Sequence, residues 1–185
     1  MSSTYLNKKK GTMKCSHSFL FSFLFLACLY SSLADKIGDV CPKTTNPQLC
    51  DKVLRSVPGS GQANFVGLCE IAINKAIDPT NSAKNLVNSL IGQTKDPILL
   101  PKYNICLQSF SDAVGKLNGC KNFLKDKNFK NLKEFATIAY VSGVDCDHQF
   151  EDPSSQNPQL KEASNNAQDY NSFVYAIATI LYGGM

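Results

Sequence analysis

The 185-residue chain contains no tryptophan and only two histidines, of which His148 alone lies outside the N-terminal segment. It has no G-x-S-x-G sequence and no glycine-rich phosphate-binding loop, and its carboxylates show no paired acid and base. A serine hydrolase would need His148 as its base, but no motif marks a nucleophile. These absences argue against an enzyme, and no cofactor is expected.

The sequence also lacks an apolar run long enough to cross a bilayer, which takes about 20 residues. Its longest run, residues 19–30, follows a stretch with four lysines and precedes the small residues Ser32 and Ala34. This order is typical of a secretory signal peptide, so we predict one over residues 1–34. A membrane anchor is the alternative, and Met13 is an alternative start with the same destination. The protein is therefore expected to be secreted.

Excess charge of either sign is also absent after Ala34. All 15 acidic residues lie at or beyond Asp35, whereas four of the 19 basic residues precede it, which leaves 15 of each (19 − 4 = 15). The basic pI thus belongs to the leader. Neither a nucleic-acid nor a membrane partner is expected for the cleaved chain, which has a suitable length for one domain over residues 35–185.

Six of the cysteines lie after Ala34, and an even number in a secreted chain indicates disulfides. Cys41 and Cys50 bracket a short turn with two prolines, where a local disulfide fits better than a zinc site, because zinc ligands usually come in tighter pairs. The other pairings depend on the fold.

Apolar residues recur at helical spacing in four long segments that begin near residues 65, 103, 129 and 160. Pro79 predicts a kink or break in the first, with Asn81 or Ser82 as cap of a restarted helix. Residues 97–101, 119–126 and 151–158 are typical of connections. Short connections favour an all-α, antiparallel up-and-down four-helix bundle over residues 61–185, preceded by a short helical hairpin over residues 35–60.

Antiparallel packing brings Cys106, early in the second bundle helix, next to Cys146, late in the third, so a disulfide can join them. Cys69 and Cys120 are candidates for a third bridge by the same argument, with two buried free thiols as the alternative. Near Cys146, Asp145, Asp147 and His148 are metal-ligand residue types, but a half-cystine cannot ligate through a thiolate. A solvated helix end explains them more simply, so we predict no metal site.

Six lysines surround the connection between the second and third bundle helices: Lys116, Lys121, Lys125, Lys127, Lys130 and Lys133. Phe123 and Phe129 lie among them. The simple interpretation is a solvated bundle end with two core aromatics. The functional alternative is a surface that meets an acidic partner.

Several segments in a fixed order resemble the plant invertase and pectin methylesterase inhibitors. They are VCPKTTNPQLC, GLCEIAINKAI, KDPILLPKYNICLQSFSDAV, GVDCDHQF and YNSFVYAIATILYG. The resemblance covers essentially all of residues 37–183. It implies a four-helix bundle after a helical hairpin, and the disulfides Cys41–Cys50 and Cys106–Cys146. It also implies a function, inhibition of an enzyme of the plant cell wall by occlusion of its active-site cleft.

The resemblance implies different contacts in the two branches of the family. For a pectin methylesterase, it implies docking through the helix faces that carry four residues: Gln108, Asp112, Asp145 and His148. For an acid invertase, it implies contacts from Lys127 and Phe129, although the proline of the usual Pro-Lys-Phe element is missing. The pectin methylesterase is the favoured target, the invertase is the alternative, and a non-inhibitory secreted bundle is a third possibility.

Overall fold

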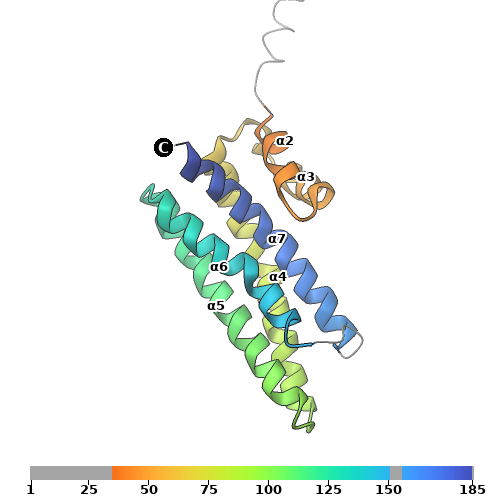
Figure 1. The fold of residues 1–185 in the computed structure, drawn as a ribbon. Helices are drawn as coiled ribbons and strands as arrows, with labels where there is room; N and C mark the ends of the chain where they lie inside the picture. The colour runs from red at the N-terminus through yellow and green to blue at the C-terminus, as the bar shows by residue number, and fades with distance from the viewer. Residues whose placement is uncertain (1–34, 151–155, 185) are drawn as a thin grey trace, which may run out of the picture. The chain divides into compact units, whose positions relative to one another are not determined.

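A computed structural model describes residues 35–150 and 156–184, and the elements in this part of the chain are all helices (Figure 1). The predicted signal peptide, residues 1–34, lies outside the described residues. Four long helices form the bundle: α4 (Phe65–Gln93), α5 (Leu99–Lys125), α6 (Phe129–Asp147) and α7 (Pro158–Gly183). The described residues contain no helix that is long and apolar enough to span a membrane.

Each bundle helix packs against two others, α4 and α6 each lying between α5 and α7. Three of the four begin with an asparagine whose side-chain oxygen accepts backbone N–H groups of the first turn: Asn64, Asn128 and Asn157. Short connections between α4, α5 and α6 reverse the chain direction, as in an up-and-down bundle. The predicted all-α fold class is confirmed.

The N-terminal part contains α2 (Lys36–Val40), the 3-10 helix η1 (Cys41–Lys43), α3 (Pro47–Arg55) and the 3-10 helix η2 (Ser60–Gln62). The expected Cys41–Cys50 disulfide joins the start of η1 to α3. Within this loop, Thr45 Oγ1 donates a hydrogen bond to Asp169 Oδ1 at 2.7 Å, and Asn46 Nδ2 donates to Asp169 Oδ2 at 2.9 Å. The disulfide therefore shapes a turn that is attached to α7 by polar contacts.

Pro79 does not break the first bundle helix. The single helix α4 continues through it, so the predicted break and the restart capped by Asn81 or Ser82 are wrong, while the kink stays a prediction. Ala76, Thr80 and Ala83 are fully buried around the proline, and this packing holds the chain helical despite the missing N–H donor. The Thr80 hydroxyl, next to the proline, donates to the Ala76 carbonyl oxygen at 2.8 Å.

Substitution of Pro79 by alanine is expected to raise the free energy of unfolding by roughly 2–3 kcal/mol, because alanine restores a backbone donor and removes a ring clash. Thermal unfolding should show an increase in Tm of about 5–10 °C for a chain of this length. The control is Ser82→Ala, an exposed position on the same helix with an expected gain of about 0.5 kcal/mol. A Pro79 variant no more stable than this control would contradict the prediction.

The second bundle helix extends further than its sequence pattern indicated. Residues 119–126 were expected to form a connection, but α5 continues to Lys125. Cys120 and Leu124 prolong its buried stripe. A Cβ atom on Gly119 would lie 2.7 Å from the Phe135 ring, so the glycine allows a close approach between α5 and α6 rather than ending the helix. Pro101 likewise lies in the first turn of α5 instead of in a loop.

Polar groups in the interior also define how the helices pair. Asn171 on α7 is fully buried, and its Nδ2 donates to the Ala139 carbonyl oxygen at 2.9 Å. The buried Ser164 hydroxyl donates to the Gly143 carbonyl oxygen at 3.1 Å. Both bonds join α6 to α7, so a shift in register would leave buried polar groups without partners, at a cost of about 1–3 kcal/mol each.

Candidate functional site

The Cys106–Cys146 disulfide joins α5 to α6, and the Cα atoms of the two cysteines are 4.5 Å apart. The bond therefore fixes which residues of the two helices lie opposite each other. Gln108 lies two residues after Cys106, and Asp145 directly precedes Cys146. Both side chains are exposed. The structure therefore brings these two predicted contact residues to the same level of neighbouring helices.

Asp112 extends the polar group by one helical turn. It is exposed and accepts a hydrogen bond from Gln108 Nε2 at 2.9 Å. His148 is exposed at the C-terminal cap of α6, close in sequence to Asp145. All four residues predicted for pectin methylesterase binding thus lie in the part of α5 and α6 around the disulfide.

Exposed apolar residues accompany this polar group and were not identified from the sequence. Ile98 is 69% exposed and Ile105 is 44% exposed. Ile105 lies on the same stripe of α5 as Asp112, seven residues or about two helical turns before it, and Ile98 lies a further seven residues back, at the N-cap of the helix. The sequence shows that these isoleucines lie outside the buried stripe of α5. Periodicity alone does not show whether another helix covers them.

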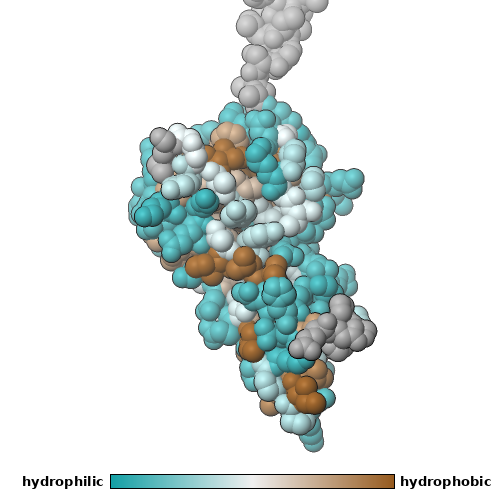
Figure 2. All heavy atoms as spheres, in the orientation of Figure 1, coloured by the Kyte–Doolittle hydropathy of each residue, from teal (hydrophilic) through white to brown (hydrophobic). Residues whose placement is uncertain are grey.

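The exposed surface of α6 is also apolar near the middle of the helix. Ile138, Val141 and Val144 are partly exposed on α6. In Figure 2, hydrophobic residues form a band across the middle of the visible face, over the region where Figure 1 shows α6. We call the surface formed by Ile105, Gln108, Asp112, Ile138 and Asp145 the α5–α6 face. Its apolar centre with polar residues around it resembles a typical protein–protein interface.

Lys127 and Phe129 lie elsewhere, at the connection between α5 and α6. Phe129 and Asp145 are both on α6 and are separated by about 24 Å along its axis, at 1.5 Å per residue. Phe129 is partly buried and packs against the core. The structure therefore does not bring the two sets of predicted contacts into one patch.

Lys127 also has a structural role. Its φ angle is 53°, in the left-handed region, where glycine is usual at the end of a helix. The Asn128 N–H donates to the Phe123 carbonyl oxygen at 2.8 Å and the Lys127 N–H donates to the Leu124 carbonyl oxygen at 3.2 Å. This pair of bonds is a Schellman motif, so Lys127 closes α5 and Asn128 begins α6.

Cys69 and Cys120 do not form the third bridge. Both are free and fully buried. Cys120 Sγ lies 3.8 Å from the carbonyl oxygen of Leu132 on α6, where its S–H donates a weak bond, so this thiol is satisfied without a disulfide. Burial raises the pKa of Cys69 well above its ordinary value and raises the pKa of Cys120 to about 12. The alternative of two buried free thiols is therefore the one found.

Both carboxylate oxygens of Asp147 are engaged by other side chains. Its Oδ2 forms an ion pair with Lys161 Nζ at 2.6 Å, and its Oδ1 accepts a hydrogen bond from Gln156 Nε2 at 2.9 Å. These contacts join the end of α6 to the start of α7. Among residues 35–150 and 156–184, no three histidine, cysteine or acidic side chains form a possible metal cluster.

Comparison with known proteins identifies one family and several relatives within it. Residues 35–181 match the model of the family described as "Plant invertase/pectin methylesterase inhibitor". The chain is 30% identical over 178 residues to "Pectinesterase inhibitor" of Actinidia deliciosa, with 91% of this chain and 96% of the relative covered. It is 25% identical over 157 residues to "Putative invertase inhibitor" of Platanus orientalis, with 84% of this chain and 92% of the relative covered.

The fold is similar to that of a solved structure, "mutant form A of a pectin methylesterase inhibitor from Arabidopsis". The TM-score is 0.71 and the sequence identity is 18%, with 80% of this chain and 97% of that chain covered. At this identity the similarity concerns the fold alone.

Proposed function

Because the chain belongs to the plant invertase/pectin methylesterase inhibitor family, whose relatives named above are inhibitors and not enzymes, we propose that it inhibits a plant pectin methylesterase. The α5–α6 face is the docking surface, and it occludes the active-site cleft of the enzyme. The observation that carries the proposal is the exposed Ile105 on the same face as Gln108, Asp112 and Asp145. A surface of this kind supports a complex that buries roughly 1,200–2,000 Å² in total.

The polar and apolar parts of this face have separate roles. Gln108, Asp112 and Asp145 supply hydrogen-bond acceptors that set the orientation of the target, while Ile105 and Ile138 supply apolar area that is removed from water. Asp112 is already oriented by its bond from Gln108, which lowers the entropy lost on binding. The face lies on two helices joined by a disulfide, so it changes shape little on docking.

The first test is a titration of oxidised residues 35–185 against a pectin methylesterase and an acid invertase, at pH 5 and pH 7. Inhibition of the pectin methylesterase alone is the expected result. If folded protein at micromolar concentration inhibits neither enzyme, the proposal is wrong.

Substitution of Ile105 by aspartate is expected to weaken inhibition of the pectin methylesterase by roughly 30-fold or more, because it places a charge at the apolar centre of the interface. The residue is exposed, so the fold is retained, and circular dichroism checks this. The matched control is Asn122→Asp, which adds the same charge at an exposed position of α5 about 25 Å further along the helix. Equal inhibition constants for the two variants would show that this face does not contact the enzyme.

An acid invertase is the second candidate target, supported by the similarity to the relative from Platanus orientalis. In that case Lys127 and Phe129, at the α5–α6 connection, make the contacts. Lys127→Gly tests this cleanly, since glycine suits the left-handed backbone at this position and removes only the charged side chain. Unchanged inhibition of invertase by Lys127→Gly and by Phe129→Ala would rule out this contact.

The place of action follows from the same proposal. We place the mature chain in the plant apoplast, with residues 1–34 acting as a signal peptide that is cleaved after Ala34. An N-terminal sequence that begins at Asp35 in protein recovered from the cell wall is the expected result. An intact N-terminus would contradict this proposal.

A further inference from the structure

The lysines around the end of α5 are divided by the structure into two groups. Lys116 Nζ lies 4.1 Å from the centre of the Phe135 ring, and Lys133 Nζ lies 4.9 Å from that of Tyr182. These two ammonium groups are thus engaged by aromatic rings within the protein. The other four are exposed: Lys121, Lys125, Lys127 and Lys130. Within residues 35–150 and 156–184, none of the four has a side-chain hydrogen bond or an ion pair.

This concentration of charge is local. Residues 116–133 contain six lysines and a single carboxylate, Asp126, although the chain after Ala34 carries equal numbers of acidic and basic residues. Like charges placed close together repel one another, so such a group favours an anionic partner.

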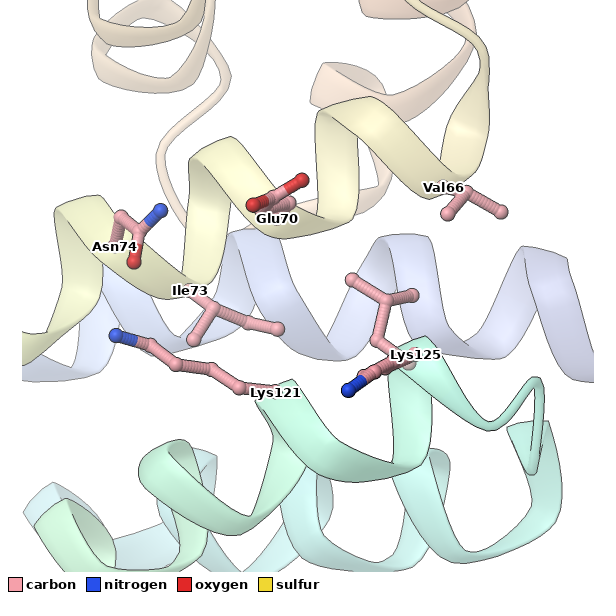
Figure 3. A pocket seen from close by; sticks show the side chains of 7 residues that line it. Val66, Glu70, Ile73, Asn74, Lys121 and Lys125 are labelled. Atoms are coloured by element: carbon pink, nitrogen blue, oxygen red, sulfur yellow. The ribbon is translucent and has the colours of Figure 1, made fainter.

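A pocket of about 330 Å³ lies beside two of these lysines, between α4 and α5 (Figure 3). Its floor is apolar, with Ile73 fully buried and Leu124 nearly so, and Val66 at one end. Its rim is polar, with Glu70 and Asn74 on α4 and Lys121 and Lys125 on α5. We call it the α4–α5 pocket. The volume is at the lower end of the range for small-molecule sites, roughly 300–1,000 Å³.

The side chains around the pocket are arranged as two opposing edges. Figure 3 shows Glu70 and Asn74 along one edge and Lys121 and Lys125 along the other, with Ile73 pointing between them. The stem of Lys121 lies along the pocket, and its ammonium group points toward the end occupied by Asn74. The pocket therefore offers cationic donors, an amide and a carboxylate acceptor above an apolar surface.

We propose that the α4–α5 pocket binds one uronic acid residue of an acidic polysaccharide, polygalacturonate. Lys121 and Lys125 hold its carboxylate, Asn74 and Glu70 hold its hydroxyl groups, and the C–H face of the ring packs on Ile73 and Leu124. Lys127 and Lys130 continue from Lys125 around the connection to α6 and meet the carboxylates of neighbouring sugars.

The observations favour this polymer over a nucleic acid. Single-stranded nucleic acids bind through aromatic side chains on which bases stack. The nearby Phe123 packs edge-on against Phe135 with ring centres 4.8 Å apart, and Phe129 packs against the core. Neither ring is free to stack, and Glu70 at the rim accepts hydrogen bonds from the hydroxyl groups of a sugar.

The choice of galacturonate rests on the proposed function, since hydrolysis of the methyl esters of pectin leaves free galacturonate carboxylates. The α4–α5 pocket lies on the α4 side of α5, whereas the α5–α6 face lies on the other side. One molecule can therefore bind the enzyme and the demethylated polymer together, which concentrates the inhibitor where the enzyme has already acted.

The test is a calorimetric titration of oxidised residues 35–185 with a galacturonate decamer at pH 6 and low ionic strength, with the fully methyl-esterified decamer as the neutral comparison. Binding of the acid and loss of binding with the ester are expected. The double variant Lys121→Gln/Lys125→Gln should weaken binding at least tenfold. The matched control, Lys52→Gln/Lys95→Gln, removes the same charge at two exposed positions elsewhere and should change affinity less than twofold.

A second variant separates the pocket from a simple charge patch. Asn74→Phe places a ring at the exposed rim without a change in charge, and it should weaken binding as strongly as the double lysine variant. If Asn74→Phe binds normally, or a DNA strand of equal charge binds as tightly as the decamer, the uronate site is wrong. If the protein inhibits the pectin methylesterase but does not bind the galacturonate decamer, this inference alone is wrong. If it binds the decamer but does not inhibit the enzyme, the proposed function alone is wrong.

Discussion

Replacement of Cys106 and Cys146 by alanine is expected to lower the free energy of unfolding by about 4 kcal/mol. The two residues are 40 positions apart, and a disulfide that closes a loop of this length removes a large conformational entropy from the unfolded chain. Domains of this size are stable by only about 5–15 kcal/mol, so the loss is a large part of the total. Urea unfolding followed by circular dichroism measures it.

The second disulfide provides the comparison. Cys41 and Cys50 close a loop of only nine positions, so their replacement by alanine should cost less, about 2.5 kcal/mol. The order of the two effects follows from loop length. An equal or larger loss for the Cys41 and Cys50 variant would show that contacts in the folded state, such as those of the turn with Asp169, outweigh chain entropy.

The second large effect is expected at alkaline pH, where the protein should lose stability as the pH rises above about 9. Cys69 and Cys120 have pKa values in the folded state above their ordinary value of 9.0, because burial disfavours the thiolate. Below pH 9 both thiols are protonated in the folded and the unfolded chain, so their full contribution to stability is present. Above pH 9 only the unfolded chain releases these protons, which favours unfolding.

The size of this effect follows from the proton count. Each thiol should contribute a slope of about 1.4 kcal/mol per pH unit, so the two together lower stability by roughly 5 kcal/mol at pH 11. Urea unfolding at several pH values measures the slope, and Cys69→Ala/Cys120→Ala is the control, because it lacks both thiols and keeps every other titratable group. Parallel pH profiles for the two proteins would mean that the thiols ionise as readily in the folded state.

Much of the fold could be predicted because it depends on local patterns. Residues such as Leu117, Leu132 and Phe173 lie at helical spacing and are fully buried in the bundle. Helical periodicity predicted this because a helix has one face to bury. The spacing of Cys106 and Cys146 within their helices was sufficient to predict a bridge once antiparallel packing was assumed.

The predictions that proved wrong concern helix ends, where packing overrides a local sequence signal. Pro79 and Gly119 are normally helix breakers, yet both lie inside helices. At Pro79, buried neighbours on both sides keep α4 continuous, and at Gly119 the Phe135 ring requires the absence of a side chain. Such contacts join residues far apart in sequence, so no pattern within one segment records them.

The sequence by itself determined the fold class, the partners of the local and the central disulfide, and the family, since all depend on residue order and spacing. Only the tertiary structure decided that Cys69 and Cys120 remain thiols, that Ile105 stays exposed beside Asp112, and that Lys121 faces Glu70 and Asn74 across a pocket. The physical reason is that burial, exposure and cavities are created between helices, when faces from distant segments pack together.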